Sequence, residues 1–253
     1  METVTHDGRT TAYRETGFGD GPTVCYVHGA GGDHGVWVEQ YGDREGPPAV
    51  AVDLSGHGDS DDVTTEPGME TIAAYADDVA AVCEATDASV ICGNSMGGAV
   101  ALWVALEGDL DLDALVLSDT GAKLGVDPGF LESLARNFEA AVASLHVPDT
   151  LFHDPDDELV EVSKAGLLES GQAVTVRDFE SCDTFDVRDR LDEIDVPTLA
   201  LCGEHDPLTP PSFHEYLEAE LSSCEYVEIA DAAHMPMLEK PEVFNESVRS
   251  FLL

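Results

Sequence analysis

The sequence is poor in positively charged residues. It has 11 Lys and Arg against 52 Asp and Glu in 253 residues, which gives a formal net charge of −41. Nucleic acids and anionic lipid surfaces are bound through basic patches, so this charge disfavours both kinds of partner. The acids are spread along the chain rather than gathered in a tail. This pattern predicts a folded domain with an acidic coat, the kind of surface that suits a salt-rich cytoplasm.

The sequence also lacks a long apolar run. No stretch approaches the ~18–20 residues that a membrane-spanning helix needs. The opening segment, Met1–Asp7, has neither the basic nor the apolar region of a secretion signal. We therefore expect a cytoplasmic protein with no membrane partner. The oligomeric state, monomer or dimer, stays open.

Metal-binding patterns are missing as well. The six cysteines form no CxxC pair, and no Cys/His spacing suggests zinc. Cys25, Cys92 and Cys202 fall inside apolar runs, where a thiol serves as a small core residue. We expect no metal and no organic cofactor.

Short apolar runs alternate with helical patterns along most of the chain. An opening hairpin around Asp7-Gly8 precedes them. This alternation predicts an α/β fold with a mostly parallel sheet of eight strands and helices on both faces. The six runs are 23–27, 49–52, 89–92, 114–117, 198–202 and 226–229, and the clearest helical patterns are 69–85, 96–106 and 241–253.

The alternation breaks once, between Asp119 and about Asp183. This stretch contains helical patterns at 130–142 and 159–168 but no convincing strand. An insertion of about 60 residues between two strands must lie over an edge of the sheet, which predicts a lid.

The sharpest local signal is Gly-Asn-Ser-Met-Gly at positions 93–97. A buried strand ends directly before it and a helix begins directly after it. A turn this tight holds the central serine in a strained conformation at the positive end of the helix. The pattern predicts that Ser95 is a nucleophile rather than a helix-capping serine.

A serine hydroxyl needs a neighbouring base, and the base needs an orienting acid. His234 follows the last predicted strand, and Asp206 follows the strand before it. The chain order Ser, Asp, His, with each residue at the end of a strand, predicts a catalytic triad. Asp119 also follows a strand and is the alternative acid.

These residues resemble the α/β-hydrolase superfamily over essentially the whole chain. His-Gly-Ala-Gly-Gly at 28–32 is similar to the oxyanion-hole loop of that family. The resemblance implies that the backbone N–H groups of Ala30 and Met96 form the oxyanion hole. It also implies a core domain of residues 1–121 and 182–253, with a helical cap at 122–181. His28 and His57 receive no catalytic role.

The resemblance leaves the substrate open. Ser95 excludes relatives that carry aspartate at that position, such as haloalkane dehalogenases and epoxide hydrolases. Esterases, enol-lactonases and hydrolases of carbon–carbon bonds share the serine. Arg136 and Arg177 are the only arginines in the expected cap, so no anion-binding cluster is evident. We rank hydrolysis of small-molecule carboxylic esters first, a carbon–carbon hydrolase or enol-lactonase second, and a non-catalytic binding protein last.

Overall fold

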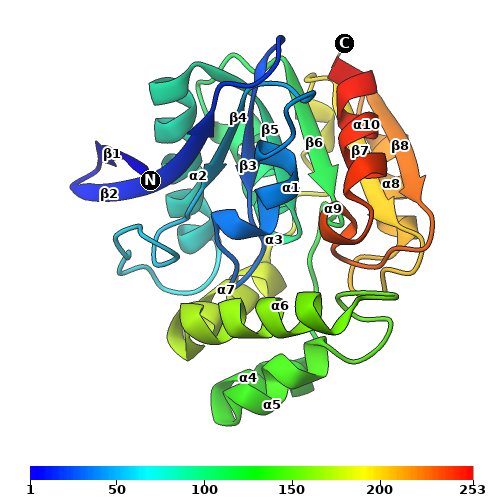
Figure 1. Ribbon diagram of the computed structural model, residues 1–253. Coiled ribbons are helices and arrows are strands. Elements are labelled where there is room, and N and C mark those ends of the chain that lie inside the picture. The colour runs from blue at the N-terminus through cyan, green and yellow to red at the C-terminus, as the bar shows by residue number, and fades with distance from the viewer. Residues whose placement is uncertain (253) are drawn as a thin grey trace.

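The computed structural model describes residues 1–252 and contains one eight-stranded sheet (Figure 1). The strand order is β1-β2-β4-β3-β5-β6-β7-β8. The first two strands form the expected antiparallel hairpin, and β3 to β8 run parallel to one another. The predicted mostly parallel sheet is confirmed. The strands are β1 Glu2–His6, β2 Arg9–Thr16, β3 Thr23–Val27, β4 Ala49–Val52, β5 Ala88–Asn94, β6 Ala114–Ser118, β7 Thr198–Gly203 and β8 Cys224–Ile229.

Helices cover both faces of the sheet. Successive side chains of each central strand point to opposite faces, so the apolar side chains on each face need a covering layer. In β3, Cys25 and Val27 join one hydrophobic core, while Val24 and Tyr26 join another. The first core lies under α2 (Met69–Thr86), α3 (Met96–Glu107) and α8 (Pro211–Glu220). The second lies under α1 (Val38–Tyr41), α9 (Pro236–Glu239) and α10 (Pro241–Leu252), with the short 3₁₀ helix η1 (His34–Trp37). The predicted last helix is confirmed as far as Leu252, and Leu253 lies outside the described residues.

Four helices lie between β6 and β7 and sit below the carboxyl ends of the parallel strands in Figure 1. We call these helices the cap. They are α4 Pro128–Arg136, α5 Phe138–Leu145, α6 Asp157–Ser170 and α7 Gln172–Thr184, and the 3₁₀ helix η2 (Leu191–Glu193) follows them. A cap inserted after β6 agrees with the expected architecture, whereas its division from the core at 121/122 and 181/182 stays a prediction.

The cap differs in detail from the sequence patterns. The single pattern at 130–142 is two helices, because the chain leaves the helical conformation at Asn137, with φ −148° and ψ 70°. The last cap helix, α7, was not predicted. Its buried side chains include Thr175, Arg177, Asp178 and Ser181. The inner face of α7 therefore lacks the apolar periodicity by which a helix is predicted from sequence.

Two further findings concern membrane-spanning helices and the cysteines. No helix in residues 1–252 is both long and apolar enough to cross a bilayer. All six cysteines lie in the described part of the chain as free thiols, five of them buried and Cys224 half-buried.

Candidate active site

Ser95 occupies the sharp turn between β5 and α3. Its backbone has φ 54° and ψ −116°, which a residue with a side chain adopts only when the surrounding structure enforces it. The Ser95 N–H donates to the Ser118 carbonyl at 3.0 Å. The Ser95 carbonyl accepts from the Gly98 N–H at 3.0 Å and from Thr120 Oγ1 at 2.7 Å. These bonds from two neighbouring segments maintain the strained turn.

The glycines on either side of Ser95 are required by close backbone approach. A Cβ atom on Gly93 would lie 2.2 Å from the Gly97 carbonyl oxygen. A Cβ atom on Gly97 would lie 2.2 Å from the Val27 carbonyl oxygen on the neighbouring strand. Any side chain at either position would therefore force the turn apart. This is the physical reason for the glycine spacing seen in the sequence.

Asp206 lies in the loop after β7 with a carboxylate that is almost fully buried. Its own loop supplies three donors. The N–H groups of Leu208 and Thr209 donate to Oδ1 at 2.8 and 3.1 Å, and Thr209 Oγ1 donates to Oδ2 at 2.6 Å. These three hydrogen bonds hold the Asp206 carboxylate in place within its own loop.

His234 forms a hydrogen bond with Asp206, the acid that the sequence favoured as its partner. Its Nδ1 donates to Asp206 Oδ2 at 2.8 Å, and both side chains are at most 5% exposed. Burial alone would raise the pKa of Asp206. The charge of His234 and the hydrogen bonds from His234 and Thr209 outweigh burial, so the pKa falls well below its usual range. Asp206 is therefore ionised wherever the protein is folded near neutral pH.

Asp119, the alternative acid, has different partners. Its Oδ1 accepts from the Gly203 N–H at 2.9 Å, and its Oδ2 lies 2.6 Å from Ser118 Oγ. Burial, reinforced by the negative charge of Asp206, raises the pKa of Asp119 well above its usual range. Asp119 is thus less readily ionised than Asp206. The histidine is paired with Asp206 and not with Asp119.

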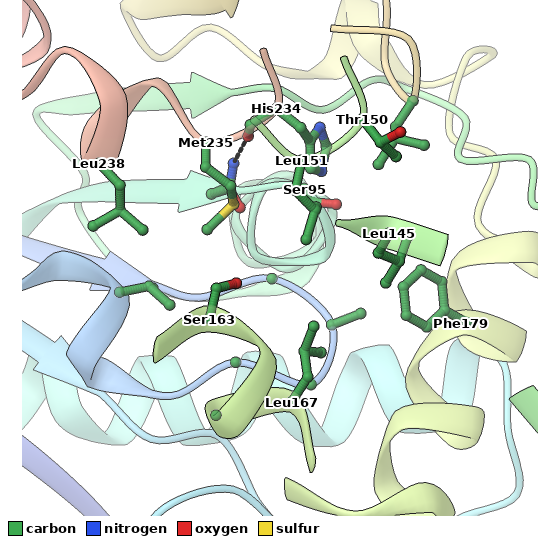
Figure 2. A pocket seen from close by; sticks show the side chains of 18 of the residues that line it. Ser95, Leu145, Thr150, Leu151, Ser163, Leu167, Phe179, His234, Met235 and Leu238 are labelled. Carbon is green, nitrogen blue, oxygen red and sulfur yellow. Dashed lines mark hydrogen bonds between the residues drawn. The ribbon is translucent and has the colours of Figure 1, made fainter. Parts of the chain in front are cut away.

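Ser95 and His234 line one cavity of about 840 Å³ beneath the cap (Figure 2). Within residues 1–252 no hydrogen bond joins Ser95 Oγ to His234. Catalytic hydrogen bonds of this kind often tighten only with substrate in place. The wall of the cavity is mostly aliphatic and aromatic. The backbone N–H of Met235 in the core donates to the Leu151 carbonyl in the cap at 3.1 Å. The apolar lining includes Leu145, Leu151, Leu167, Phe179, Met235 and Leu238.

Met96 directly follows Ser95, and Ala30 follows Gly29, which lies against the Ser95 side chain. Ala30 is the second residue of a turn closed by a hydrogen bond from the Gly32 N–H to the Gly29 carbonyl at 3.1 Å, and it lines the cavity. Met96 opens α3, so its N–H is one of those that have no partner inside the helix. In the described chain neither N–H donates to another protein group. The assignment of these two N–H groups to an oxyanion hole stays a prediction.

A second His–Asp pair lies next to the site but is closed off from it. His57 and Asp178 are both fully buried, and His57 Nε2 lies 2.8 Å from Asp178 Oδ2. His57 Nδ1 donates to the Ser55 carbonyl at 3.2 Å. Burial lowers the pKa of His57, but the charge and hydrogen bond of Asp178 outweigh it and leave that pKa raised. The family resemblance implied no catalytic role for His57, and both of its ring nitrogens are engaged in the structure.

The sequence missed Thr209 and Asp178. Thr209 follows Asp206 by three residues, a spacing at which a short polar side chain can bond back to a turn, so a local signal existed. Asp178 carries no signal among 52 acids, because its importance depends on how α7 packs on the core.

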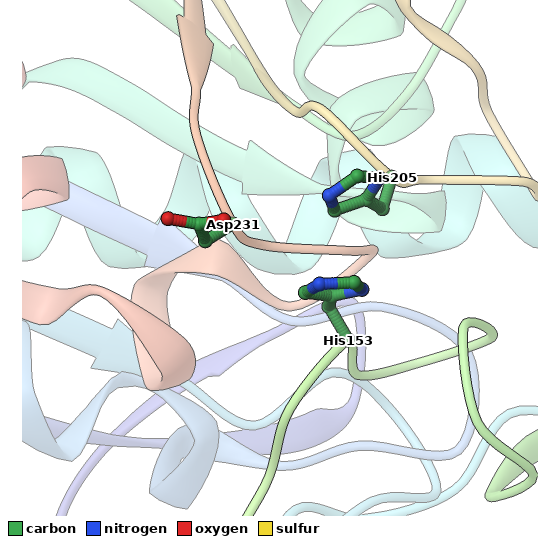
Figure 3. Close-up of side chains that lie close together, drawn as sticks. All are labelled: His153, His205 and Asp231. Atoms are coloured by element: carbon green, nitrogen blue, oxygen red, sulfur yellow. The ribbon is translucent and has the colours of Figure 1, made fainter.

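Three clusters of side chains within residues 1–252 have the composition of a metal site, and one of them contains two histidines. His153, His205 and Asp231 each place one donor atom within 4.8 Å of the others (Figure 3). The two imidazole rings are stacked, with centroids 3.8 Å apart and an angle of 26° between their planes. The ring lone pairs lie in those nearly parallel planes and do not converge on one point. The rings would have to turn before both could bind one ion, so we assign no metal to this cluster.

Comparison with known proteins agrees with this architecture. Residues 26–247 match the model of the alpha/beta hydrolase family. A 3-oxoadipate enol-lactonase of Acinetobacter baylyi is 26% identical over 97% of this chain and 94% of its own length. A pimeloyl-[acyl-carrier protein] methyl ester esterase of Neisseria meningitidis is 33% identical over 81% of this chain and 82% of its own.

Among solved structures, a thermophilic esterase superposes with a TM-score of 0.85 at 32% identity. The match covers 99% of this chain and 96% of that one. The family model spans the strained serine turn, the buried His–Asp pair and the cap between β6 and β7. This chain therefore belongs to the α/β-hydrolase family, as an esterase- or lactonase-like member.

Proposed function

We propose that the protein hydrolyses neutral carboxylic esters through an acyl-enzyme formed on Ser95. The observation that carries this proposal is the buried pair of His234 and Asp206, which lies on the cavity that Ser95 also lines. Asp206 is held ionised, so it fixes His234 with the proton on Nδ1. The Nε2 atom is then an acceptor and can serve as the base.

In the first half of the reaction, Ser95 Oγ attacks the ester carbonyl carbon while its proton passes to His234 Nε2. The carbonyl oxygen becomes an oxyanion, and we assign its two donors to the N–H groups of Ala30 and Met96. Collapse of this intermediate releases the alcohol, which takes the proton from His234. In the second half, water attacks the acyl group with His234 again as base, and the acid leaves. A single oxyanion donor is typically worth about 3–4 kcal/mol.

The cavity favours a substrate without a free carboxylate near the ester. Its lining residues include five acids and no Lys or Arg. Arg136 is highly exposed and pairs with Glu132, while Arg177 donates to Ser55, Val63 and Tyr75 in the core. An anionic group entering this cavity would lose hydration and meet no cation. The five acids are Asp33, Glu39, Asp127, Asp156 and Glu158.

A lactone is the second candidate substrate, since a lactone is a cyclic ester and needs the same steps. The likeness to an enol-lactonase supports this candidate, and the likeness to a methyl ester esterase supports an open-chain ester. The lack of a cation in the cavity argues against acidic ring-cleavage products as substrates of a carbon–carbon hydrolase.

A matched substrate pair tests the proposal. 4-Nitrophenyl butyrate and mono-4-nitrophenyl succinate have acyl chains of the same length, and only the second carries a carboxylate. We expect hydrolysis of the butyrate with kcat/KM at least about tenfold above that of the succinate. Ser95→Ala should abolish both activities, and Ser250→Ala, at an exposed position of α10, should leave them unchanged. Equal rates on the two esters would contradict the substrate class, and activity retained by Ser95→Ala would contradict the mechanism. A δ-lactone in the same assay tests the second candidate.

A further inference from the structure

The oxyanion loop is held by the cap at one residue, Gly31. The Gly31 N–H donates to Asp178 Oδ2 of α7 at 2.8 Å. The Gly31 carbonyl accepts from Ser170 Oγ at the end of α6, also at 2.8 Å. With φ at 67°, Gly31 is pressed against the cap, and an added Cβ would lie 2.6 Å from Leu167 and 3.1 Å from Thr175. The N–H and the carbonyl of Gly31 thus both have cap side chains as hydrogen-bond partners.

Gly31 directly follows Ala30, to which we assign an oxyanion donor. The N–H of Gly31 and the carbonyl of Ala30 belong to one rigid peptide plane. The bond to Asp178 therefore sets the orientation of the plane that adjoins Ala30. The other side of the turn lies on the serine turn, because a Cβ on Gly29 would be 3.1 Å from Asn94 Oδ1 and 3.2 Å from Ser95 Cβ. The loop therefore lies between the turn that carries Ser95 and the cap helices.

Asp178 is itself fixed from three directions. Its carboxylate is fully buried and accepts from the Gly31 N–H, from His57 Nε2 at 2.8 Å and from the Tyr75 hydroxyl at 2.7 Å. Burial would raise the pKa of Asp178, but the charge and hydrogen bonds of His57 and Tyr75 lower it. A buried carboxylate with this set of donors is a rigid acceptor.

We propose that Asp178 is a positioning residue that shapes the oxyanion hole from the cap. The hole is then complete only while the cap is seated on the core, so cap closure and transition-state stabilisation are coupled. This inference rests on the function proposed above. The chemical steps need only the core residues, but the orientation of Ala30 depends on α7.

Asp178→Ala removes the acceptor of the Gly31 N–H. Loss of one oxyanion donor costs about 10²–10³ in kcat, and misorientation should cost part of that. We expect a roughly 10- to 100-fold fall in kcat with KM changed less than about threefold. Asp178→Asn should recover part of the loss, because its amide oxygen can still accept from Gly31. Ki for a boronic acid that forms a tetrahedral adduct should rise in parallel with the loss of kcat/KM.

Tyr75→Phe is the matched control. It removes a hydrogen bond from the same carboxylate but leaves the bond to Gly31 intact. It should lower thermal stability and leave kcat within about twofold. Retention of kcat by folded Asp178→Ala, or an equal loss in Tyr75→Phe, would overturn the proposal.

Ser170→Ala covers the case in which the Asp178 variants do not fold. It removes only the hydroxyl that donates to Gly31. A fall of a few fold in kcat at constant KM would support the proposal, and an unchanged kcat would overturn it. If wild-type protein shows no hydrolysis that depends on Ser95, the proposed function fails instead, which is a distinct result.

Discussion

Residues 1–252 contain two buried His–Asp pairs with the same 2.8 Å contact and different surroundings. His234 and Asp206 come from neighbouring core loops, and His234 lines the cavity beside Ser95. His57 and Asp178 join the core to the cap, and neither side chain is exposed. In the first pair one ring nitrogen remains available. In the second, a carbonyl and a carboxylate occupy both ring nitrogens, so neither nitrogen is free to accept a proton from a substrate. We therefore propose that the same two types of side chain serve proton transfer in one place and positioning in the other.

Replacing the two histidines should separate these roles most sharply. We expect His234→Gln to lower kcat by roughly 10⁴- to 10⁶-fold because the base is lost, and to cost less stability than His57→Gln, because the Asp206 carboxylate keeps three donors from its own loop. His57→Gln should instead lose about 3–5 kcal/mol of stability, because it leaves the Asp178 carboxylate buried and unpaired. Steady-state kinetics and urea denaturation of both variants measure the two effects. A large loss of stability in His234→Gln with measurable activity would break the comparison.

The two buried aspartates near His234 should also differ. Asp206→Asn should lower kcat by about 10⁴-fold at neutral pH, because the amide no longer favours the His234 tautomer with the proton on Nδ1. Asp119→Asn should change kcat less than about threefold. His234 bonds to Asp206 and not to Asp119. The introduced amide would also keep both local contacts, since its NH₂ can donate to Ser118 while its oxygen accepts from Gly203. A larger effect at Asp119 than at Asp206 would reverse our assignment.

The sequence predicted more of the core than of the cap, and the reason is physical. Strands such as 23–27 and 49–52 are buried on both faces, so an uninterrupted apolar run marks each one. Ser95 and Asp206 follow two buried strands, β5 and β7, and His234 follows the half-buried strand β8, so their order along the chain could place them. In contrast, α7 buries Asp178 and Arg177, and the break at Asn137 depends on packing. Neither leaves a periodic signal. The contact of Asp178 with Gly31 spans 147 residues, which no local pattern records.

Salt should act on the surface rather than on either buried pair. With a net charge of −41, like charges repel over a Debye length of about 30 Å at 0.01 M salt and about 3 Å at 1 M. We expect the denaturation midpoint to rise from dilute buffer to molar potassium chloride. The rise should be equal in wild type and His57→Gln, since buried pairs are screened little. A flat or falling midpoint would contradict the expected salt adaptation.

The smallest effect we expect is a pH dependence of stability from the second pair. The pKa of His57 is raised in the folded protein, with Asp178 as the stabilising partner and Arg177 and His28 as opposing neighbours. Its contribution is complete below about 6.5, the pKa of an unfolded histidine, and is lost as pH rises through the folded-state value. Wild type should therefore lose stability from pH 6 to pH 9 relative to His57→Gln. Thermal melts of both proteins across this range provide the comparison, and parallel curves would show that His57 is not held charged.

Covalent labelling tests the central claim, that Ser95 is the nucleophile, most directly. A fluorophosphonate reacts with a serine activated by a neighbouring base and stays attached. After incubation with one equivalent, intact-mass measurement should show a single adduct, and peptide mapping should place it on Ser95. His234→Gln should label far more slowly. An unlabelled wild-type protein, or an adduct on another serine, would contradict the account.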